Sequence, residues 1–567
     1  MRTRSLGAAA LALLTSDCVY CADAAAVDVD GPPGTVMGFA NAVSGDGFLA
    51  VPIGTVPRPP SMANANGKRA SGAFEDQLKN MNFFYATDGE TVSPELRHPA
   101  APRHVEASMH AHAVNIGTPA QKVTVLVDTG SSELWVNPDC TTAPSQTQFR
   151  QCLTFGKYDP KKSQTPPYGP FGREDINYGD PTDRTTQTSV SIRYYSDTIA
   201  LGGAKIRNQT FGVVAASKGQ SQGILGLAPD LRGGFSSDAP YSLVLSTMAR
   251  QGVIASRVFA LDLRHSESET GAVIYGGLDR SKFIGALERR PMVRGLKNEF
   301  RLAVALSTVG VTLQSGPQNF AVAGADANVM LDSGTTLSRM HAAVALPILQ
   351  ALDARDDGEG YYQVPCAMAG AQGSVDFGFG GKTIRVPLRD FIMHLSGSGS
   401  AAACYVGMVL TTDQQILGDS VLRAGYFVFD WDNEAVHIAQ AANCGSSDIV
   451  AVGSGTGAVP QVSGNCQESD AKFTGSPQPT RTRTGSFPTQ AYTTVYTITA
   501  CPGFDSSCQT GVVTTQTVQP GPSATSASAS AGSTGGGKSG SSAGVRPAAL
   551  TGALVVAGAL TVLYNVL

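Results

Sequence analysis

The sequence predicts a mainly β protein built from two related halves. An apolar run, an Asp and a turn occur in Val-Leu-Val-Asp128-Thr-Gly-Ser-Ser, and the same order returns in Val-Met-Leu-Asp332-Ser-Gly-Thr-Thr. Each apolar run indicates a short buried strand, and the glycine after it indicates a sharp turn. The composition agrees, because 64 Gly, 32 Pro and only 15% charged residues in 567 are typical of a secreted β protein.

The two repeated Asp residues are candidate catalytic groups. Each follows a predicted strand, so two such loops facing each other would bring Asp128 and Asp332 together. At short range both carboxylates cannot ionise, and the pair then holds one proton across the acid range. The ionised partner can take a proton from water while the protonated partner polarises a carbonyl group.

A second repeat extends the likeness between the halves. Gly223-Ile-Leu-Gly and Gln415-Ile-Leu-Gly follow the two Asp loops at similar spacing. With these segments, and with Asp-Thr-Gly-Ser-Ser-Glu-Leu-Trp-Val at 128–136, the chain resembles the pepsin-like aspartic proteases from residue 70 to residue 442. The resemblance implies a bilobal pepsin-like fold of two pseudo-symmetric antiparallel β lobes with the active-site cleft between them. It implies peptide hydrolysis in acid, no cofactor and no metal, and Ile-Leu-Gly segments that support the Asp loops from behind.

The resemblance also gives individual residues a role. The catalytic pair is Asp128 and Asp332, the supporting residues are Gly130, Ser131, Gly334 and Thr335, and a flap over bound peptide carries Tyr178, Gly179 and Asp180. The Tyr178 hydroxyl is expected to reach the indole N–H of Trp135. Asp180 resembles an acidic residue of fungal members that accept Lys or Arg before the scissile bond, since a carboxylate there can pair with a cation. An ordinary turn Asp is the alternative.

The chain before the first lobe has the features of an exported precursor. Two arginines, an apolar run and a small-residue cleavage site predict a signal peptide over residues 1–24. Residues 25–69 predict a propeptide, because they are rich in Gly and Pro and end in the dibasic pair Lys68-Arg69. The N-terminal protease lobe is then 70–288 and the C-terminal lobe 289–442.

Residues 89–113 form an unusual insertion in the expected first strand pair. The family pattern runs from an aromatic strand directly into Val114, which this segment separates from that strand. The segment is either an inserted loop or translated intron, because the codons at both of its ends can encode splice-site sequences. His110-x-His112 within it is a weak metal signal, since no cluster of carboxylates accompanies the two histidines.

The cysteine count suits an oxidising compartment. The signal peptide holds two of the ten cysteines, and the other eight form an even set. Sequence alone allows 105 pairings of eight cysteines. The resemblance and short loops favour Cys140 with Cys152 and Cys366 with Cys404, while proximity suggests Cys444 with Cys466 and Cys501 with Cys508.

The C-terminal end predicts attachment at the cell surface. Residues 443–545 are a Ser/Thr/Gly-rich stalk, whose composition is typical of an extended glycosylated segment. Residues 546–567 are a hydrophobic tail that indicates a glycosylphosphatidylinositol (GPI) anchor, with a membrane-spanning helix as the alternative. The predicted location is extracellular, on the plasma membrane or in the cell wall. Asn208-Gln-Thr is an N-glycosylation sequon.

Together these features resemble the yapsin-type, surface-anchored aspartic proteases of fungi. The expected partners are peptide or protein substrates and a membrane, and the expected state is a monomer. A net charge of -4 gives no nucleic-acid footprint. The alternative is a cell-wall or adhesion protein that uses the fold as a binding module, but two intact Asp motifs favour the enzyme. Glycoside hydrolysis by paired carboxylates lacks its own sequence signature.

Overall fold

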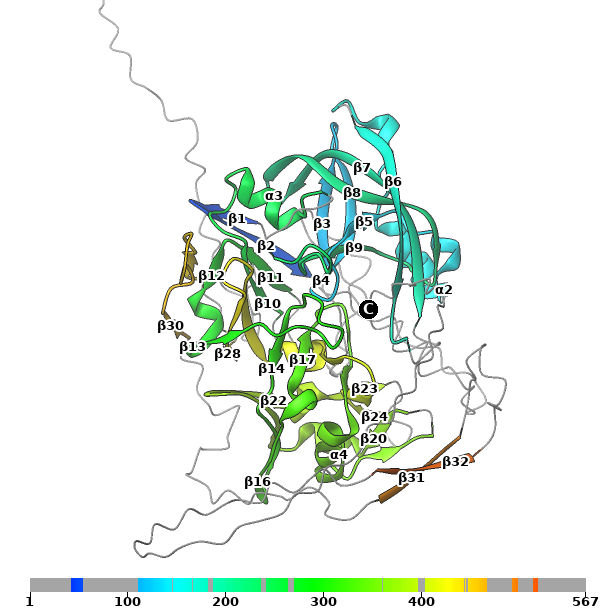
Figure 1. Cartoon of the computed structure of the whole chain (residues 1–567), viewed down its shortest axis with the longest axis vertical. Helices are drawn as coiled ribbons and strands as arrows, with labels where there is room; N and C mark the ends of the chain where they lie inside the picture. The colour runs from blue at the N-terminus through cyan, green and yellow to red at the C-terminus, as the bar shows by residue number, and fades with distance from the viewer. Residues whose placement is uncertain are drawn as a thin grey trace, which may run out of the picture. The chain divides into compact units, whose positions relative to one another are not determined.

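The computed structural model describes both halves of the chain and parts of the flanking segments (Figure 1). The described residues are 42–54, 111–144, 146–165, 167–181, 187–235, 241–263, 270–358, 360–395, 403–442, 444, 447–466, 492–497 and 513–518. The predicted signal peptide, Lys68-Arg69, Cys501, Cys508 and the predicted hydrophobic tail lie outside these ranges.

The described chain is mainly β, as the sequence predicts, and one sheet of fifteen strands runs through both halves. In order of hydrogen-bonded neighbours, the sheet contains β30 (Ser463–Asn465), β13 (Phe283–Pro291), β28 (Ala435–Ala441), β27 (Gly425–Asp430), β10 (Val258–Asp262), β11 (Thr270–Tyr275), β2 (Phe48–Gly54), β3 (Ala111–Ile116), β4 (Gln121–Asp128), β9 (Gly223–Gly226), β5 (Leu134–Val136), β8 (Ala204–Lys218), β7 (Thr188–Leu201) and β6 (Tyr168–Tyr178), with β1 (Val43–Gly45) beside β2.

Smaller sheets complete the second half. The first contains β14 (Ala303–Ala305), β17 (Asn328–Leu331), β26 (Gln415–Leu417), β18 (Ser338–Met340) and β25 (Met408–Leu410). The second contains β16 (Gly316–Ala321), β15 (Thr308–Leu313), β21 (Ser374–Phe379) and β22 (Lys382–Pro387). The third contains β19 (Arg355–Asp356), β20 (Tyr362–Val364), β24 (Ala403–Val406) and β23 (Ile392–Leu395). Two-stranded pairs are β12 (Gly277–Asp279) with β29 (Ile449–Ala451), and β31 (Tyr492–Thr497) with β32 (Val513–Val518).

Helices are short and connect the strands. The α-helices are α2 (Gln146–Thr154), α3 (Val244–Arg250), α4 (Ala342–Ala351), α5 (Leu388–Phe391) and α6 (Asp419–Leu422). Single 3-10 turns are η2 (Cys140–Thr142), η3 (Pro160–Lys162), η4 (Arg280–Lys282), η5 (Gly324–Ala327) and η6 (Cys366–Gly370). Within the described ranges, none of the helices has both the length and the apolar character needed to cross a bilayer.

The two halves are joined through the large sheet. β10 from the first half pairs with β27 from the second, and the Phe259 and Phe429 rings opposite each other stack with centroids 4.8 Å apart. β13 pairs with β28 and contains the boundary expected between residues 288 and 289. The expected boundary therefore falls inside one continuous strand.

The predicted propeptide contributes an interior strand to this sheet. β2 lies between β11 and β3, with Val51 opposite Val273 and Gly54 opposite Ala111. Ile53 is fully buried. Within the described part of this segment, residues 43–45 and 48–54 thus form strands. β3 begins at Ala111, so the last three residues of the unusual 89–113 segment extend the strand instead of preceding it.

The chain after β28 is folded as far as Cys466, although its composition placed it in the stalk from position 443. β29 and β30 pair with β12 and β13, Val452 is buried, and a disulfide joins Cys444 to Cys466. The Lys282 ammonium, itself buried, donates to the Cys444 carbonyl oxygen at 2.9 Å. Valines spaced among glycines and serines give this polar segment an apolar face, so the folded region extends farther than the composition indicated.

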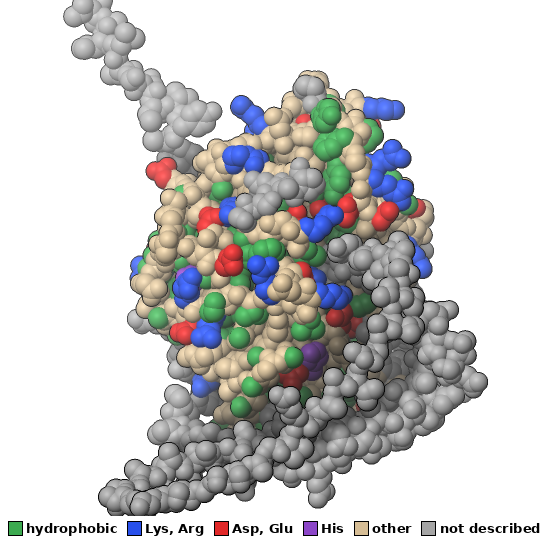
Figure 2. Space-filling view, in the orientation of Figure 1, with side chains coloured by type: hydrophobic (Ala, Val, Ile, Leu, Met, Phe, Trp, Pro, Cys, Tyr) green, Lys and Arg blue, Asp and Glu red, His purple; other side chains and the backbone are tan. Residues whose placement is uncertain are grey.

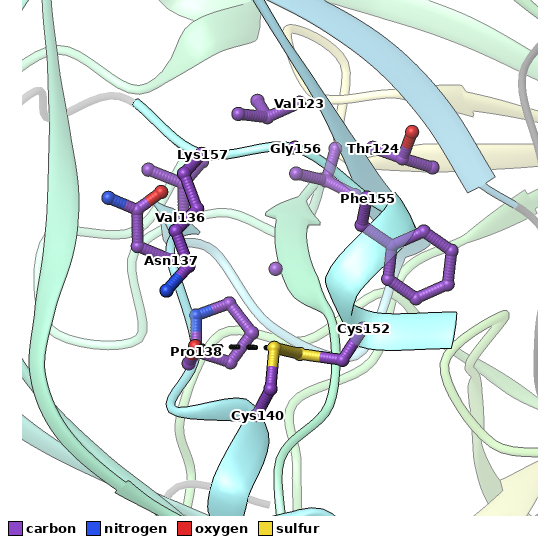
Figure 3. Close-up of a pocket in the computed structure, with 12 residues that line it drawn as sticks. Val123, Thr124, Val136, Asn137, Pro138, Cys140, Cys152, Phe155, Gly156 and Lys157 are labelled. Carbon is purple, nitrogen blue, oxygen red and sulfur yellow. Dashed lines mark hydrogen bonds between the residues drawn. A yellow bond between two sulfur atoms is a disulfide. The ribbon is translucent and has the colours of Figure 1, made fainter. Parts of the chain in front are cut away.

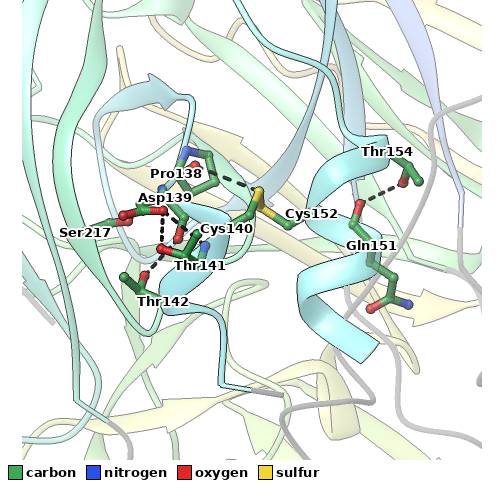
Figure 4. The surroundings of a disulfide bond; sticks show 9 residues. All are labelled: Pro138, Asp139, Cys140, Thr141, Thr142, Gln151, Cys152, Thr154 and Ser217. Atoms are coloured by element: carbon green, nitrogen blue, oxygen red, sulfur yellow. Dashed lines mark hydrogen bonds between the residues drawn. A yellow bond between two sulfur atoms is a disulfide. The ribbon is translucent and has the colours of Figure 1, made fainter. Parts of the chain in front are cut away.

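The disulfides expected from the resemblance are both formed, Cys140–Cys152 and Cys366–Cys404. Figure 4 shows the first of them next to Asp139, whose carboxylate accepts hydrogen bonds from the backbone N–H and the hydroxyl of Thr141 at 3.0 and 2.7 Å. The pairing of Cys444 with Cys466, expected from proximity, is also present. Each bridge closes a loop within one half or at its end, so none links the first half to the second.

Candidate active site

The two repeated Asp loops have the same strand environment in both halves. Asp128 ends β4, which pairs in parallel with β9, and Asp332 follows β17, which pairs in parallel with β26. β9 and β26 are the two Ile-Leu-Gly segments, and they lie beside the Asp strands as the resemblance implied. Backbone hydrogen bonds link Leu227 N–H to the Asp128 carbonyl at 2.8 Å and Asp332 N–H to the Leu417 carbonyl at 3.0 Å. The repeat in sequence is therefore a repeat in parallel strand pairing.

Glycine allows the two carboxyl groups to approach each other. A Cβ atom added at Gly130 would lie 2.6 Å from the Asp332 carboxyl carbon, and one added at Gly334 would lie 2.4 Å from Asp128 Oδ1. Neither distance leaves room for a side chain. Each Asp thus lies directly over the glycine of the opposite loop.

Each carboxylate is held by its own loop in the same way. Asp128 accepts from Gly130 N–H at 2.8 Å through Oδ1 and from the Ser131 hydroxyl through Oδ2. Asp332 accepts from Gly334 N–H at 2.7 Å and from the Thr335 hydroxyl at 2.6 Å. These are the hydroxyl contacts expected from the resemblance, and they leave the inner edges of the pair to face each other.

The residues between Asp and Gly lock the two loops together. The Thr129 hydroxyl donates to the Leu331 carbonyl at 2.8 Å, and the Ser333 hydroxyl donates to the Val127 carbonyl at 2.8 Å. Each hydroxyl oxygen also accepts the other residue's backbone N–H, at 2.9 and 3.2 Å. Sequence analysis did not assign this role. The available signal was a hydroxyl at the same position of both repeats.

The electrostatics of the pair favour a single shared proton. Burial, together with the negative charge of Asp332, raises the pKa of Asp128. Hydrogen bonds from Ser131 and Gly130 oppose this shift but do not cancel it. A buried carboxyl that keeps its proton beside an ionised one is the arrangement that acid–base activation of water requires.

The predicted flap is a hairpin made of β6 and β7. Tyr178 ends β6 opposite Thr188, and Gly179 begins the turn with a φ of 94°. The Trp135 indole N–H donates to the Tyr178 hydroxyl at 2.7 Å, which is the contact expected from the sequence. Burial and the Asp128 charge raise the pKa of Tyr178, so its ring hydroxyl stays neutral above the pair.

Asp180, expected to pair with a substrate Lys or Arg, already has a cation beside it in the fold. Its carboxylate is 5% exposed and accepts from Arg339 Nη1 at 3.0 Å and from the Thr411 hydroxyl at 3.1 Å. Both donors belong to the second half of the chain. The flap carboxylate is already paired with a cation of the protein, and no local sequence pattern indicates this partner.

A second acidic group near the flap also escaped sequence analysis. Glu133 lies in the turn that leads into β5, and burial, with the charges of Glu174 and Asp230, raises its pKa to about 8. Arg232, 3.5 Å from Glu174, and a hydrogen bond with Tyr194 act in the opposite direction. The buried Glu133 Oε2 has no hydrogen-bond partner among the described residues. This carboxyl therefore holds its proton over most of the acid and neutral range.

One pocket of the described structure is lined by residues other than the Asp pair. Figure 3 shows it between Val123, Val136 and Phe155 and the Cys140–Cys152 disulfide, and its lining includes no acidic side chain. Among the residues described, no group of three or more His, Cys, Asp and Glu side chains has the arrangement of a metal site. The sequon residue Asn208 is exposed on β8.

Comparisons with known proteins give the following matches. The family described as eukaryotic aspartyl protease matches residues 109–441, more than half of the chain. Candidapepsin-3 of Candida albicans is 33% identical over 358 residues, 61% of this chain and 83% of that protein. The probable aspartic-type endopeptidase opsB of Aspergillus oryzae is 29% identical over 367 residues, covering 63% and 73%. The solved aspartic proteinase from Irpex lacteus aligns with a TM-score of 0.45 at 22% identity, covering 59% and 94%.

We predict that the hydroxyl lock stabilises the fold. Thr129→Val and Ser333→Ala should each lower the free energy of unfolding by about 1 to 3 kcal/mol, because a buried carbonyl and a buried N–H lose their partner. Urea unfolding measures the change. The control Thr141→Val removes an exposed hydroxyl and should cost less than about 0.5 kcal/mol. Equal losses in all three variants would contradict the lock.

We also predict greater stability in acid than at neutral pH. Glu133 has a pKa of about 8 in the fold against 4.5 when unfolded, so its contribution is full below pH 4.5 and is lost as the pH rises towards 8. Asp419, whose pKa burial also raises to about 8, acts in the same direction. Melting temperatures between pH 4 and 8 should fall, and less steeply in Glu133→Gln. The exposed Glu434→Gln is the control, and a parallel fall in both variants would refute the assignment.

Proposed function

We propose a mechanism and a cellular setting for this chain, which belongs to the eukaryotic aspartyl protease family and is an aspartic endopeptidase. It hydrolyses peptide bonds in peptide or protein substrates. Asp128 and Asp332 are proposed as its catalytic pair, working in acid on a water molecule. The observation that carries this proposal is the approach of two buried carboxyl groups over opposing glycines, one with a raised pKa.

The chemistry follows from the single proton of the pair. The ionised carboxylate takes a proton from water as the water oxygen attacks the peptide carbonyl carbon. The protonated carboxyl donates to the carbonyl oxygen, and the proton taken up is later passed to the leaving nitrogen. As the pH rises and both carboxyls ionise, the donor is lost and turnover should stop. No cofactor and no metal takes part in this scheme.

The flap is proposed to close over the bound peptide. Tyr178 and Gly179 lie at its tip, and the hydrogen bond from Trp135 fixes the Tyr178 ring. A closed flap excludes bulk water from the reacting bond and strengthens the electrostatic effect of the pair. Gly130, Ser131, Gly334 and Thr335 are proposed to keep the two carboxyl groups in the reactive geometry.

The preference for Lys or Arg before the scissile bond stays a prediction. It depends on a negative charge of Asp180, which is already bonded to Arg339. A basic substrate side chain would have to displace that guanidinium to reach the carboxylate. Any preference in the natural enzyme should therefore be small, on the order of the 0 to 1 kcal/mol of a weak ion pair.

The proposed setting is the cell surface. Relatives named secreted aspartic proteases in Candida albicans support export, as does the predicted signal peptide over residues 1–24. Residues 25–69 are proposed as a propeptide cut after Lys68-Arg69, with β2 stabilising the precursor. N-glycosylation at Asn208, the stalk and a GPI anchor complete the proposal. Acidic and basic side chains are intermixed on the face seen in Figure 2.

We predict that either Asp128→Asn or Asp332→Asn lowers turnover at least about a thousandfold, because positioned acid–base groups contribute roughly 10² to 10⁴ each. Hydrolysis of an internally quenched peptide at acidic pH measures the loss, and unchanged melting shows that the fold persists. The control Asp353→Asn changes a surface carboxylate with an 84% exposed side chain and should leave the rate unchanged. Retained activity in either pair variant, or inhibition by a chelator, would contradict the mechanism.

We predict that deleting residues 548–567 releases active enzyme into the medium, because this is the apolar segment proposed to retain the protein. Phosphatidylinositol-specific phospholipase C should release the full-length protein as well. Release by the deletion but not by the lipase would identify a spanning helix instead. Retention of the deletion variant at the surface would refute both forms of attachment.

A further inference from the structure

An ion pair joins the flap to the opposite wall of the cleft. Asp180 and Arg339 are 159 positions apart in the chain, and Arg339 Nη1 donates to Asp180 Oδ2 at 3.0 Å. The side chains are 5% and 19% exposed, so water screens the pair weakly. The Thr411 hydroxyl donates to the same carboxylate oxygen at 3.1 Å. Two donors of the second half therefore surround one carboxylate of the first.

The cation of this pair belongs to rigid structure, while its carboxylate belongs to the flap. Arg339 lies on β18, opposite Val409 of β25 and Ile416 of β26. Thr411 follows β25, and its N–H donates to the Met340 carbonyl at 3.0 Å. Asp180 lies within the flap turn, two residues after the end of β6. The ion pair therefore joins a turn of the first half to a sheet of the second half.

We infer that Arg339 is the residue that sets the charge selectivity of the cleft, because it masks Asp180. The inference rests on the proposed function, since it requires a peptide lying between the flap and the Asp pair. Asp180 lies near the Asp pair, because Tyr178, two residues before it, is bonded to Trp135 of β5, and β5 pairs with β9 beside the Asp128 strand. A substrate side chain under the flap tip therefore meets a carboxylate and a guanidinium that neutralise each other.

Each charge of the pair becomes a binding site for the opposite charge when its partner is removed. Without Arg339, the enclosed Asp180 carboxylate keeps the Thr411 hydroxyl as a donor but loses the Arg339 guanidinium, so a substrate Lys or Arg can take the place of that guanidinium. Without Asp180, Arg339 and Thr411 surround a vacant carboxylate position, which a substrate Asp or Glu can fill. With both residues present, neither a positive nor a negative substrate side chain is strongly rejected, because the charges of Asp180 and Arg339 offset each other.

Charge-scanned peptides test the inference. Each set has Lys, norleucine or Glu at one position and is otherwise identical, and the scanned position moves across the scissile bond. The measured quantity is the ratio of kcat/KM for the Lys peptide to that for the Glu peptide, at about pH 5.5, where a substrate Glu is mostly ionised.

At one of the scanned peptide positions, the Lys/Glu ratio of kcat/KM for the natural enzyme should lie within about threefold of unity. Arg339→Met should raise that ratio about tenfold, and Asp180→Asn should lower it about tenfold, or 1.4 kcal/mol each. The double variant should return to the natural ratio, because the two groups act on each other. Unchanged ratios in the single variants, or a double variant that keeps either shift, would overturn the inference.

Two further measurements make the outcome decisive. Arg355→Met removes a guanidinium whose side chain is 83% exposed and should leave every ratio unchanged. Binding of the same peptides in the Asp128→Asn background gives the ratios without turnover. Absence of cleavage with the expected binding ratios counts against the proposed mechanism alone, whereas cleavage with unchanged ratios counts against Arg339 alone. If Arg339→Met does not fold, the Asp180→Asn ratio decides.

Discussion

The reciprocal hydrogen bonds of Thr129 and Ser333 are the constraint on which the site depends. They tie together the two loops at the point where each carries its Asp, and both hydroxyls donate to carbonyls of the opposite half at 2.8 Å. Both residues are fully buried, so water does not compete for these bonds. A small shift between the loops would separate the carboxyls and weaken the effect of the Asp332 charge, which is one of the two causes that raise the pKa of Asp128.

A symmetric scaffold carries an asymmetric site. In the first half β4 and β9 run parallel and β5 runs antiparallel to β9, and in the second half β17, β26 and β18 repeat this arrangement. The flap belongs to the first half, while the second half supplies Arg339 and Thr411 at the facing position. Duplication explains why the two Asp loops match, and divergence explains why their surroundings have different charges.

Sequence predicted the local parts of this structure and missed the pairings between distant parts. The strand, Asp and glycine turn of each loop are written in consecutive residues, and the Trp135–Tyr178 contact came from a family resemblance. The lock between Thr129 and Ser333 joins residues 204 positions apart, and the Asp180–Arg339 pair joins residues 159 apart. A single sequence contains no record of such partners. The fold of residues 447–466 was missed because average composition hides a few well-placed valines.

The disulfide between Cys444 and Cys466 determines how a mechanical load would enter the protein. Tension applied to the chain beyond Cys466 passes through the covalent bridge to Cys444 and bypasses the 22-residue loop. From there it reaches β28, which is hydrogen-bonded to strands on both sides, and the Lys282 ammonium holds the Cys444 carbonyl against it. The weak strand β30 is thereby shielded from force. When the folded domain is pulled from this end, it should unfold only when the large sheet itself unfolds.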